Sequence, residues 1–90
     1  NRVFAIVLEC IKTPIAKKIT KNLDIPTIGI GSSVHCDGQV LVTDDLIGLN
    51  HTNIKFVKKF LNVKRYINSG IKKFASEVRS KKYPTKKHSY

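Results

Sequence analysis

An unbroken apolar run near the start of the chain most restricts the possible folds. Residues 3–9, VFAIVLE, contain no polar residue before the final glutamate and show no alternation of apolar and polar side chains. This pattern is typical of a strand that is buried on both faces, as the strands of parallel sheets are. The run therefore predicts a strand over residues 3–9 in an α/β fold.

The segments that follow predict a helix and a second strand. A helix is expected near residues 14–23, because Pro14 suits its first turn and apolar residues then recur every four positions. The segment IPTIGIG predicts a strand over residues 27–31. Strand, helix and strand in this order form a parallel βαβ unit. A sheet of only two strands is marginally stable, so we expect the chain to be part of a longer protein with further strands upstream.

The second half of the chain predicts three further helices. Residues 38–47 fit either a strand at their start or a helix, and we favour a helix that ends at Gly48. Residues 53–61 and 66–80 each place their apolar side chains on one helical face. Pro84 prevents the last helix from continuing toward the C-terminus.

The charge of the chain raises the question of an anionic partner. It has 17 Lys and Arg against 6 Asp and Glu, a net charge of +11 at pH 7. Such an excess can indicate binding to nucleic acid or to an anionic membrane surface. The lysines are scattered, however, and only Arg2, Arg65 and Arg79 are arginines, the residue that base and phosphate readout favours. We expect a solvated basic surface with no nucleic-acid or membrane partner, and keep a small basic nucleic-acid-binding module as the alternative.

The cysteines and the hydropathy bear on the cellular location. Cys10 and Cys36 do not form a disulfide framework for a chain of this size, and Cys10 follows an apolar run, so we expect it to be a buried thiol. No apolar run approaches the roughly 20 residues that cross a bilayer. These features predict a protein of the reducing cytoplasm.

Glu9 is the first candidate for chemistry. Folds of the α/β class place functional side chains at the carboxyl ends of their parallel strands, because loops open there. Glu9 ends the first predicted strand, and a carboxylate at that edge suits a general base. The alternative is a glutamate that simply reaches solvent, and the position alone does not decide between the two.

Other candidates carry weaker signals. Gly29 and Gly31 would allow the backbone to approach a ligand or an anion, although a tight turn is the simpler interpretation. Residues 35–37, HCD, and the pair Asp44 and Asp45 are potential metal ligands. Adjacent side chains rarely face one ion together, so we predict no metal site in either group.

The order of several short segments resembles a known family. VLEC, IPTIGIG and CDGQVLV, followed by EVRSKKYP and HSY, are similar in order and spacing to the C-terminal part of the ketopantoate hydroxymethyltransferases. The similarity extends over essentially the whole chain. The chain departs from the family pattern at Ser32 and Ser33, where Ala-Gly is usual, and at Asp44, where His is usual.

The resemblance implies a (βα)8 TIM barrel, a fold of about 250 residues. Residues 1–90 would be a C-terminal fragment of this single domain, holding the last two barrel strands and the C-terminal helices. The fragment by itself would be inactive. The family forms homo-oligomers, so a homo-oligomer is expected.

The resemblance also implies an activity. The family transfers a hydroxymethyl group from 5,10-methylenetetrahydrofolate to 3-methyl-2-oxobutanoate, giving 2-dehydropantoate for pantothenate and coenzyme A biosynthesis. Glu9 matches the family's proton acceptor, and Gly29 and Gly31 match glycines at the barrel mouth. A Mg²⁺ ion, bound by carboxylates upstream of these residues, holds the small-molecule substrate. A non-catalytic remnant of such an enzyme is a further alternative.

Overall fold

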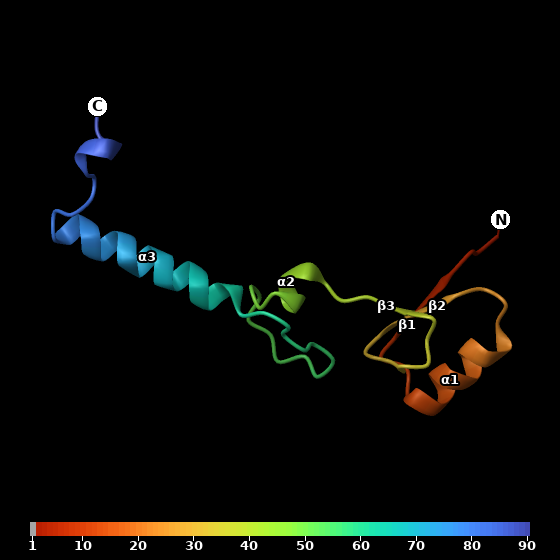
Figure 1. The fold of residues 1–90 in the computed structure, drawn as a ribbon. Coiled ribbons are helices and arrows are strands. Elements are labelled where there is room, and N and C mark those ends of the chain that lie inside the picture. The colour runs from red at the N-terminus through yellow and green to blue at the C-terminus, as the bar shows by residue number, and fades with distance from the viewer. Residues whose placement is uncertain (1) are drawn as a thin grey trace.

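The computed structural model describes residues 2–90 and shows an α/β chain with one small parallel sheet (Figure 1). The strand order is β1-β2-β3, and both neighbouring pairs are parallel. The sheet and α1 lie at one end of the chain, and α3 extends away from them (Figure 1). In chain order the elements are β1 (Ile6–Glu9), α1 (Thr13–Asn22), β2 (Thr27–Ile30), β3 (Gly38–Gln39), α2 (Thr43–Leu46), α3 (Val63–Arg79) and the 3₁₀ turn η1 (Lys86–His88).

The predicted strand–helix–strand unit is confirmed in the first half of the fold. β1 and β2 pair in parallel, with Ile6 opposite Thr27 and Glu9 opposite Ile30. β1 is shorter than the predicted strand, because its pairing starts at Ile6, whose N–H donates to the Pro26 carbonyl at 3.0 Å. At its other end, β1 stops at Glu9, the residue that closes the apolar run.

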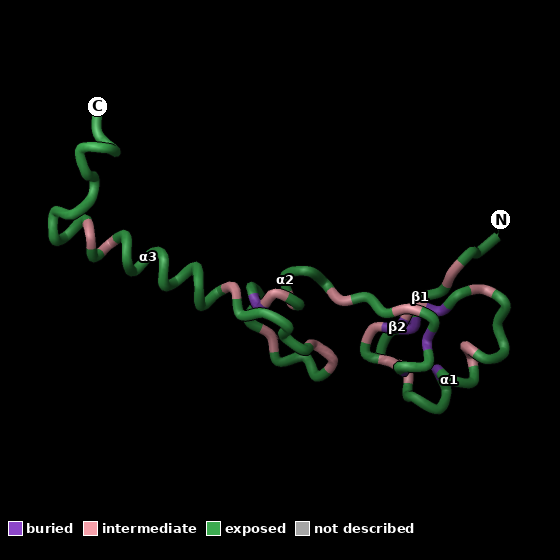
Figure 2. The backbone as a smooth tube through the Cα atoms, viewed as in Figure 1, coloured by how far each residue is buried: buried purple, intermediate pink, exposed green. Residues whose placement is uncertain are grey.

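Helix α1 covers one face of the sheet. Leu8 of β1 packs with Ala16 of α1 and with Cys36, and all three side chains are buried. Ile11 and Ile19 pack against this cluster and remain half-buried. The hydrophobic core of the described chain lies here, between β1, α1 and the loop that carries Cys36 (Figure 2).

Among residues 2–90, the opposite face of the sheet has no such cover. Side chains alternate between the two faces of a strand, so Val7 lies on the face away from Leu8 and α1, beside its register partner Ile28. Val7 is 57% exposed. Because parallel sheets are normally covered on both faces, this face is suited to pack against further structure.

The predicted helix over residues 38–47 is wrong in its first half. Gly38–Gln39 pair with β2 as a third parallel strand, and the Val40 N–H donates to the Gly29 carbonyl at 3.0 Å. The free edge of β2 offers partners to N–H groups that the first turn of a helix leaves unpaired. The helix begins only at Thr43, and Gly48, with φ of 77°, follows its end as predicted.

The predicted helix over residues 53–61 is also wrong. A single turn forms where the Val57 N–H donates to the Ile54 carbonyl. The Phe60 N–H then donates to the carbonyl of Leu46, the last residue of α2, at 2.8 Å. Hydrogen bonds to a neighbouring element thus replace the bonds within a helix that the apolar spacing predicts.

The predicted helix over residues 66–80 is confirmed as α3, which begins slightly earlier. The Asn62 side chain caps its start by accepting a hydrogen bond from the Arg65 N–H at 3.3 Å. None of the described helices has both the length and the apolar character that a membrane crossing needs. The large apolar side chains of the predicted inner face are all exposed, namely Ile67, Ile71, Phe74 and Val78.

The described chain is elongated rather than compact. Its radius of gyration is 21.9 Å and its extents are 66 × 29 × 17 Å, whereas a compact domain of this length would have a radius of about 12 Å. Apart from Gly48, just after α2, the buried residues gather around the sheet, and α3 is exposed along most of its length (Figure 2). The exposed large apolar side chains therefore do not pack together into one core among the described residues.

Candidate functional site

The loops that follow β1 and β2 meet at the carboxyl edge of the sheet. Together with part of the segment before α3, they surround an open cavity of about 700 Å³. Ligands of open α/β sheets bind outside the carboxyl ends of the strands, so this cavity is the candidate site. Its walls are formed by residues 10–13 and 31–34, with Gln39, Lys55 and Phe56.

Glu9 is the last residue of β1 and precedes Cys10, the first residue of the cavity wall, without itself lining the cavity. It pairs in register with Ile30, the last residue of β2. Since Leu8 faces α1, the Glu9 side chain lies on the opposite, open face of the sheet. Glu9 is exposed in the described chain. The carboxylate thus lies at the carboxyl end of a parallel strand, as the sequence predicts, and is free to contact a ligand.

Cys10 was expected to be a buried thiol, and this expectation is wrong. Cys10 is exposed and lines the cavity. Its φ of 55° lies in the left-handed region, where residues other than glycine are uncommon. The chain turns out of the sheet at this residue, which keeps its side chain out of the core. Cys36 is the buried cysteine of the chain.

Gly29 and Gly31 lie where the strand and the cavity meet, but protein side chains occupy the space beside them. A Cβ on Gly29 would lie 3.0 Å from the Cys36 sulfur. Gly31 has φ of 65°, and a Cβ there would lie 2.6 Å from a ring carbon of Phe56. Gly31 also lines the cavity. The two glycines therefore permit close packing within the chain, and a role in ligand contact stays a prediction.

Replacing Gly31 by alanine in the complete protein should lower its stability by about 2 kcal/mol or more, because the left-handed backbone and the Phe56 ring both oppose a Cβ. The free energy of unfolding, measured with a chemical denaturant, checks this. Gly70→Ala is the matched control, since Gly70 lies in α3 with no atom within 4 Å of an added Cβ. That variant should gain up to about 1 kcal/mol. Equal stability of the two variants would contradict the assignment.

Residues 35–37 do not converge on a common point. His35 is exposed, whereas Cys36 is buried in the core. The Asp37 carboxylate accepts a hydrogen bond from the N–H of the buried Thr27 at 2.8 Å. Asp37 thus ties the loop to the start of β2, which is a structural role.

The pair Asp44 and Asp45 lies in the first turn of α2, where negative charge is favourable. Asp45 also accepts a hydrogen bond from the Asn50 amide at 3.0 Å. Among residues 2–90, no group of three or more His, Cys, Asp or Glu side chains could hold a metal ion. The carboxylates of this chain other than Glu9 therefore do not form a second candidate site.

Sequence reasoning missed most of the residues that line the cavity, among them Ser32, Lys55 and Phe56. Ser32 accepts a hydrogen bond from the Ile11 N–H and donates one to the Leu8 carbonyl. Its signal is a hydroxyl directly after a strand-ending glycine, a position where side chains often bond to the backbone. Lys55 and Phe56 reach the cavity from a segment that the apolar spacing assigns to a helix, so no local signal identifies them.

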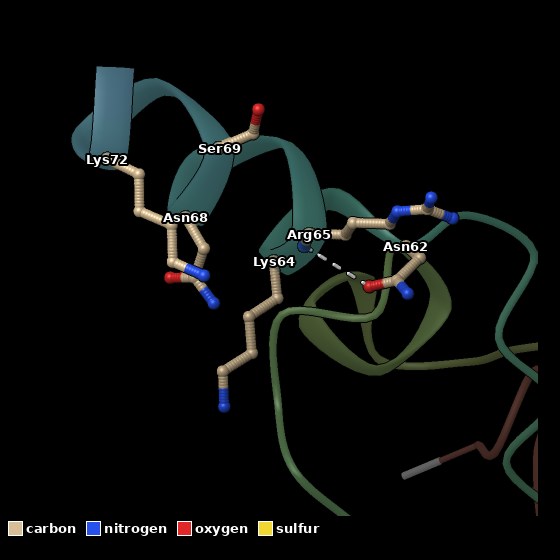
Figure 3. A pocket seen from close by; sticks show the side chains of 6 residues that line it. All are labelled: Asn62, Lys64, Arg65, Asn68, Ser69 and Lys72. Carbon is tan, nitrogen blue, oxygen red and sulfur yellow. Dashed lines mark hydrogen bonds between the residues drawn. The ribbon is translucent and has the colours of Figure 1, made fainter. Parts of the chain in front are cut away.

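A second depression, of about 530 Å³, lies on the first turns of α3 (Figure 3). Every residue around it is exposed. Lysine, arginine, asparagine and serine side chains surround it, and the Asn62 side chain is already used to cap the helix (Figure 3). It offers no carboxylate, thiol or histidine, so the cavity at the sheet edge is the better candidate for chemistry.

Comparison with known proteins places this arrangement in a family. Residues 2–86 match the family model described as ketopantoate hydroxymethyltransferase. Three curated relatives named 3-methyl-2-oxobutanoate hydroxymethyltransferase come from Pelagibacter ubique, Carboxydothermus hydrogenoformans and Pyrobaculum arsenaticum, at 60%, 47% and 44% identity. These matches cover 98%, 97% and 96% of this chain but 34%, 32% and 33% of the relatives. The chain thus spans about a third of the length of these relatives, and it belongs to the ketopantoate hydroxymethyltransferase family.

Proposed function

We propose that the complete protein containing these residues transfers a hydroxymethyl group from 5,10-methylenetetrahydrofolate to 3-methyl-2-oxobutanoate, giving 2-dehydropantoate. The observation that carries this proposal is the position of Glu9 at the carboxyl end of a parallel strand, in a chain that belongs to this family. The relatives named above, which match nearly all of this chain, carry the corresponding enzyme name.

In this proposal, Glu9 is the proton acceptor. The C3–H of 3-methyl-2-oxobutanoate lies next to a ketone, so its removal gives an enolate whose carbon can then attack the one-carbon donor. A general base must stand within hydrogen-bond reach of the proton that it removes. The exposed Glu9 carboxylate lies on the open face of the sheet, one residue before Cys10 in the cavity wall, and is suited to that contact.

The Mg²⁺ ion that the resemblance implies does not fit the residues of this chain. Mg²⁺ prefers several oxygen ligands in octahedral geometry, and residues 2–90 offer no group of three or more acidic, histidine or cysteine side chains for it. We therefore assign any ligands of that ion to other parts of the complete protein and derive no step from it.

The open face of the sheet supports the proposal that residues 1–90 form the C-terminal part of a (βα)8 barrel. Val7 and Ile28 project from this face, which in a closed barrel would point inward and be covered by side chains of the other strands. Homo-oligomer formation and a cytoplasmic location belong to the same proposal, because the family resemblance implies both.

The complete protein should convert the two substrates and one water molecule, the source of the new hydroxyl oxygen, to 2-dehydropantoate and tetrahydrofolate in a mass-spectrometric assay. It should also exchange the C3 proton of 3-methyl-2-oxobutanoate in D2O when the folate donor is left out, since the proton acceptor acts before the donor reacts. Loss of the C3 proton signal by NMR reports this step. A folded, metal-supplemented protein that does neither would contradict the proposal and would favour the non-catalytic alternative.

A further inference from the structure

The Ser32 hydroxyl makes two hydrogen bonds to the backbone on either side of Glu9. The hydroxyl oxygen accepts from the Ile11 N–H at 3.0 Å, and the O–H donates to the Leu8 carbonyl at 2.7 Å. The direction of both bonds is determined, because an amide N–H can only donate and a carbonyl can only accept. The hydroxyl therefore links Leu8, which precedes Glu9, to Ile11, which follows Cys10. It bridges the Glu9–Cys10 dipeptide from the loop after β2.

The two hydrogen bonds of Ser32 span a turn with an unfavourable backbone conformation. Cys10 adopts φ of 55°, a conformation that non-glycine residues keep only where the surrounding contacts require it. On one side, the Cys10 N–H donates to the Ile30 carbonyl at 2.9 Å. On the other side stands Ser32, which follows Gly31, itself at φ of 65°. Two left-handed residues, each directly after one of two adjacent strands, thus bring the serine hydroxyl and the end of β1 together.

The geometry points to Ser32 as a positioning residue for Glu9. This inference rests on the proposed role of Glu9 as proton acceptor. The side chain of Ser32 contacts the backbone on both sides of Glu9, so it acts through that backbone. Proton removal depends strongly on the placement of the base, and a small misplacement slows the reaction more than it weakens binding.

The test is Ser32→Ala in the complete protein, with C3 proton exchange of 3-methyl-2-oxobutanoate measured in D2O at a series of substrate concentrations. The kcat for exchange should fall about tenfold, the scale of one hydrogen bond, whereas KM should change less than about twofold. Ser32→Thr keeps the hydroxyl and should restore kcat to within about threefold of the parent protein.

Ser80→Ala is the matched control. It also removes a serine hydroxyl that donates to a backbone carbonyl, that of Ser76 at 2.9 Å, but it lies at the end of α3. This variant should keep the kcat of the parent. If Ser32→Ala does not fold, Ser32→Cys replaces it, and the same fall in kcat is expected because a thiol is a weak donor and acceptor.

Three results would overturn the inference. They are a kcat for Ser32→Ala within twofold of the parent, an equal loss in Ser32→Thr, and an equal loss in Ser80→Ala. The result for Glu9→Gln separates this inference from the proposed function. If Glu9→Gln abolishes exchange while Ser32→Ala does not slow it, the positioning role alone is wrong. If Glu9→Gln exchanges normally, the proposed role of Glu9 is wrong.

Discussion

Replacing Glu9 by glutamine in the complete protein should slow exchange of the C3 proton of 3-methyl-2-oxobutanoate by about 10² to 10⁴-fold, the usual contribution of a positioned general base. Glutamine has nearly the same shape but cannot accept the proton at its amide. Because glutamine keeps the shape of the side chain, the variant should still fold, with a free energy of unfolding within about 1 kcal/mol of the parent. NMR of the substrate in D2O and a denaturant titration of the variant measure the two quantities.

Glu77→Gln is the matched control for this prediction. Glu77 is the other glutamate of the chain and lies in α3, away from the sheet. The substitution removes the same charge, so a general effect of net charge on substrate binding would appear in both variants. We expect exchange at the parent rate in Glu77→Gln. Parent-like exchange in Glu9→Gln would mean that another group removes the proton.

The 90 residues produced without the rest of the protein should neither unfold cooperatively nor catalyse the reaction. The sheet has three short strands and one covered face, and α3 exposes the apolar side chains of its inner face. Small domains bury too little surface to tolerate such losses, and helices in proteins owe most of their stability to packing of their apolar face. Circular dichroism should show a weak helical signal that declines gradually on heating, and no 2-dehydropantoate should form.

The complete protein, heated under the same conditions, is the control, and it should give a sigmoidal transition. A sigmoidal transition of the isolated 90 residues, with native-like resistance to proteolysis, would contradict the prediction. It would mean that α3 finds its partner within these residues, in a more compact arrangement than a radius of gyration of 21.9 Å allows.

The first half of the fold could be predicted because local and global signals agree there. The run before Glu9 and the segment IPTIGIG have the apolar character of buried parallel strands, and the helix between them buries Ala16 against Leu8. Residues 38–61 could not be predicted in this way. Their apolar spacing fits a helix, but the edge of β2 and the end of α2 offer hydrogen bonds that redirect the backbone at Val40 and Phe60. Such partners are distant in the sequence, so a local pattern does not reveal them.

The residues of the candidate site also divide into those that a local sequence pattern predicts and those that depend on distant contacts. The place of Glu9 at the carboxyl end of a parallel strand could be predicted from the apolar run before it, whereas its role as proton acceptor stays a prediction. The exposure of Cys10 was missed because it depends on a left-handed turn that cysteine rarely adopts. Phe56 was missed as a wall of the site because its contact with Gly31 joins segments that the sequence does not relate.

The edges of the small sheet have a consequence for the cell. Among the described residues, β1 pairs only with β2, so its other edge presents backbone N–H and C=O groups to any extended chain nearby. Open edges of this kind promote aggregation, and the exposed Val7 beside it adds an adhesive apolar surface. A truncated gene product of this length would therefore be a substrate for chaperones and proteases. If this segment were produced without its partner strands, chaperones and proteases would act on it, so loss of catalysis would not be the only consequence for the cell.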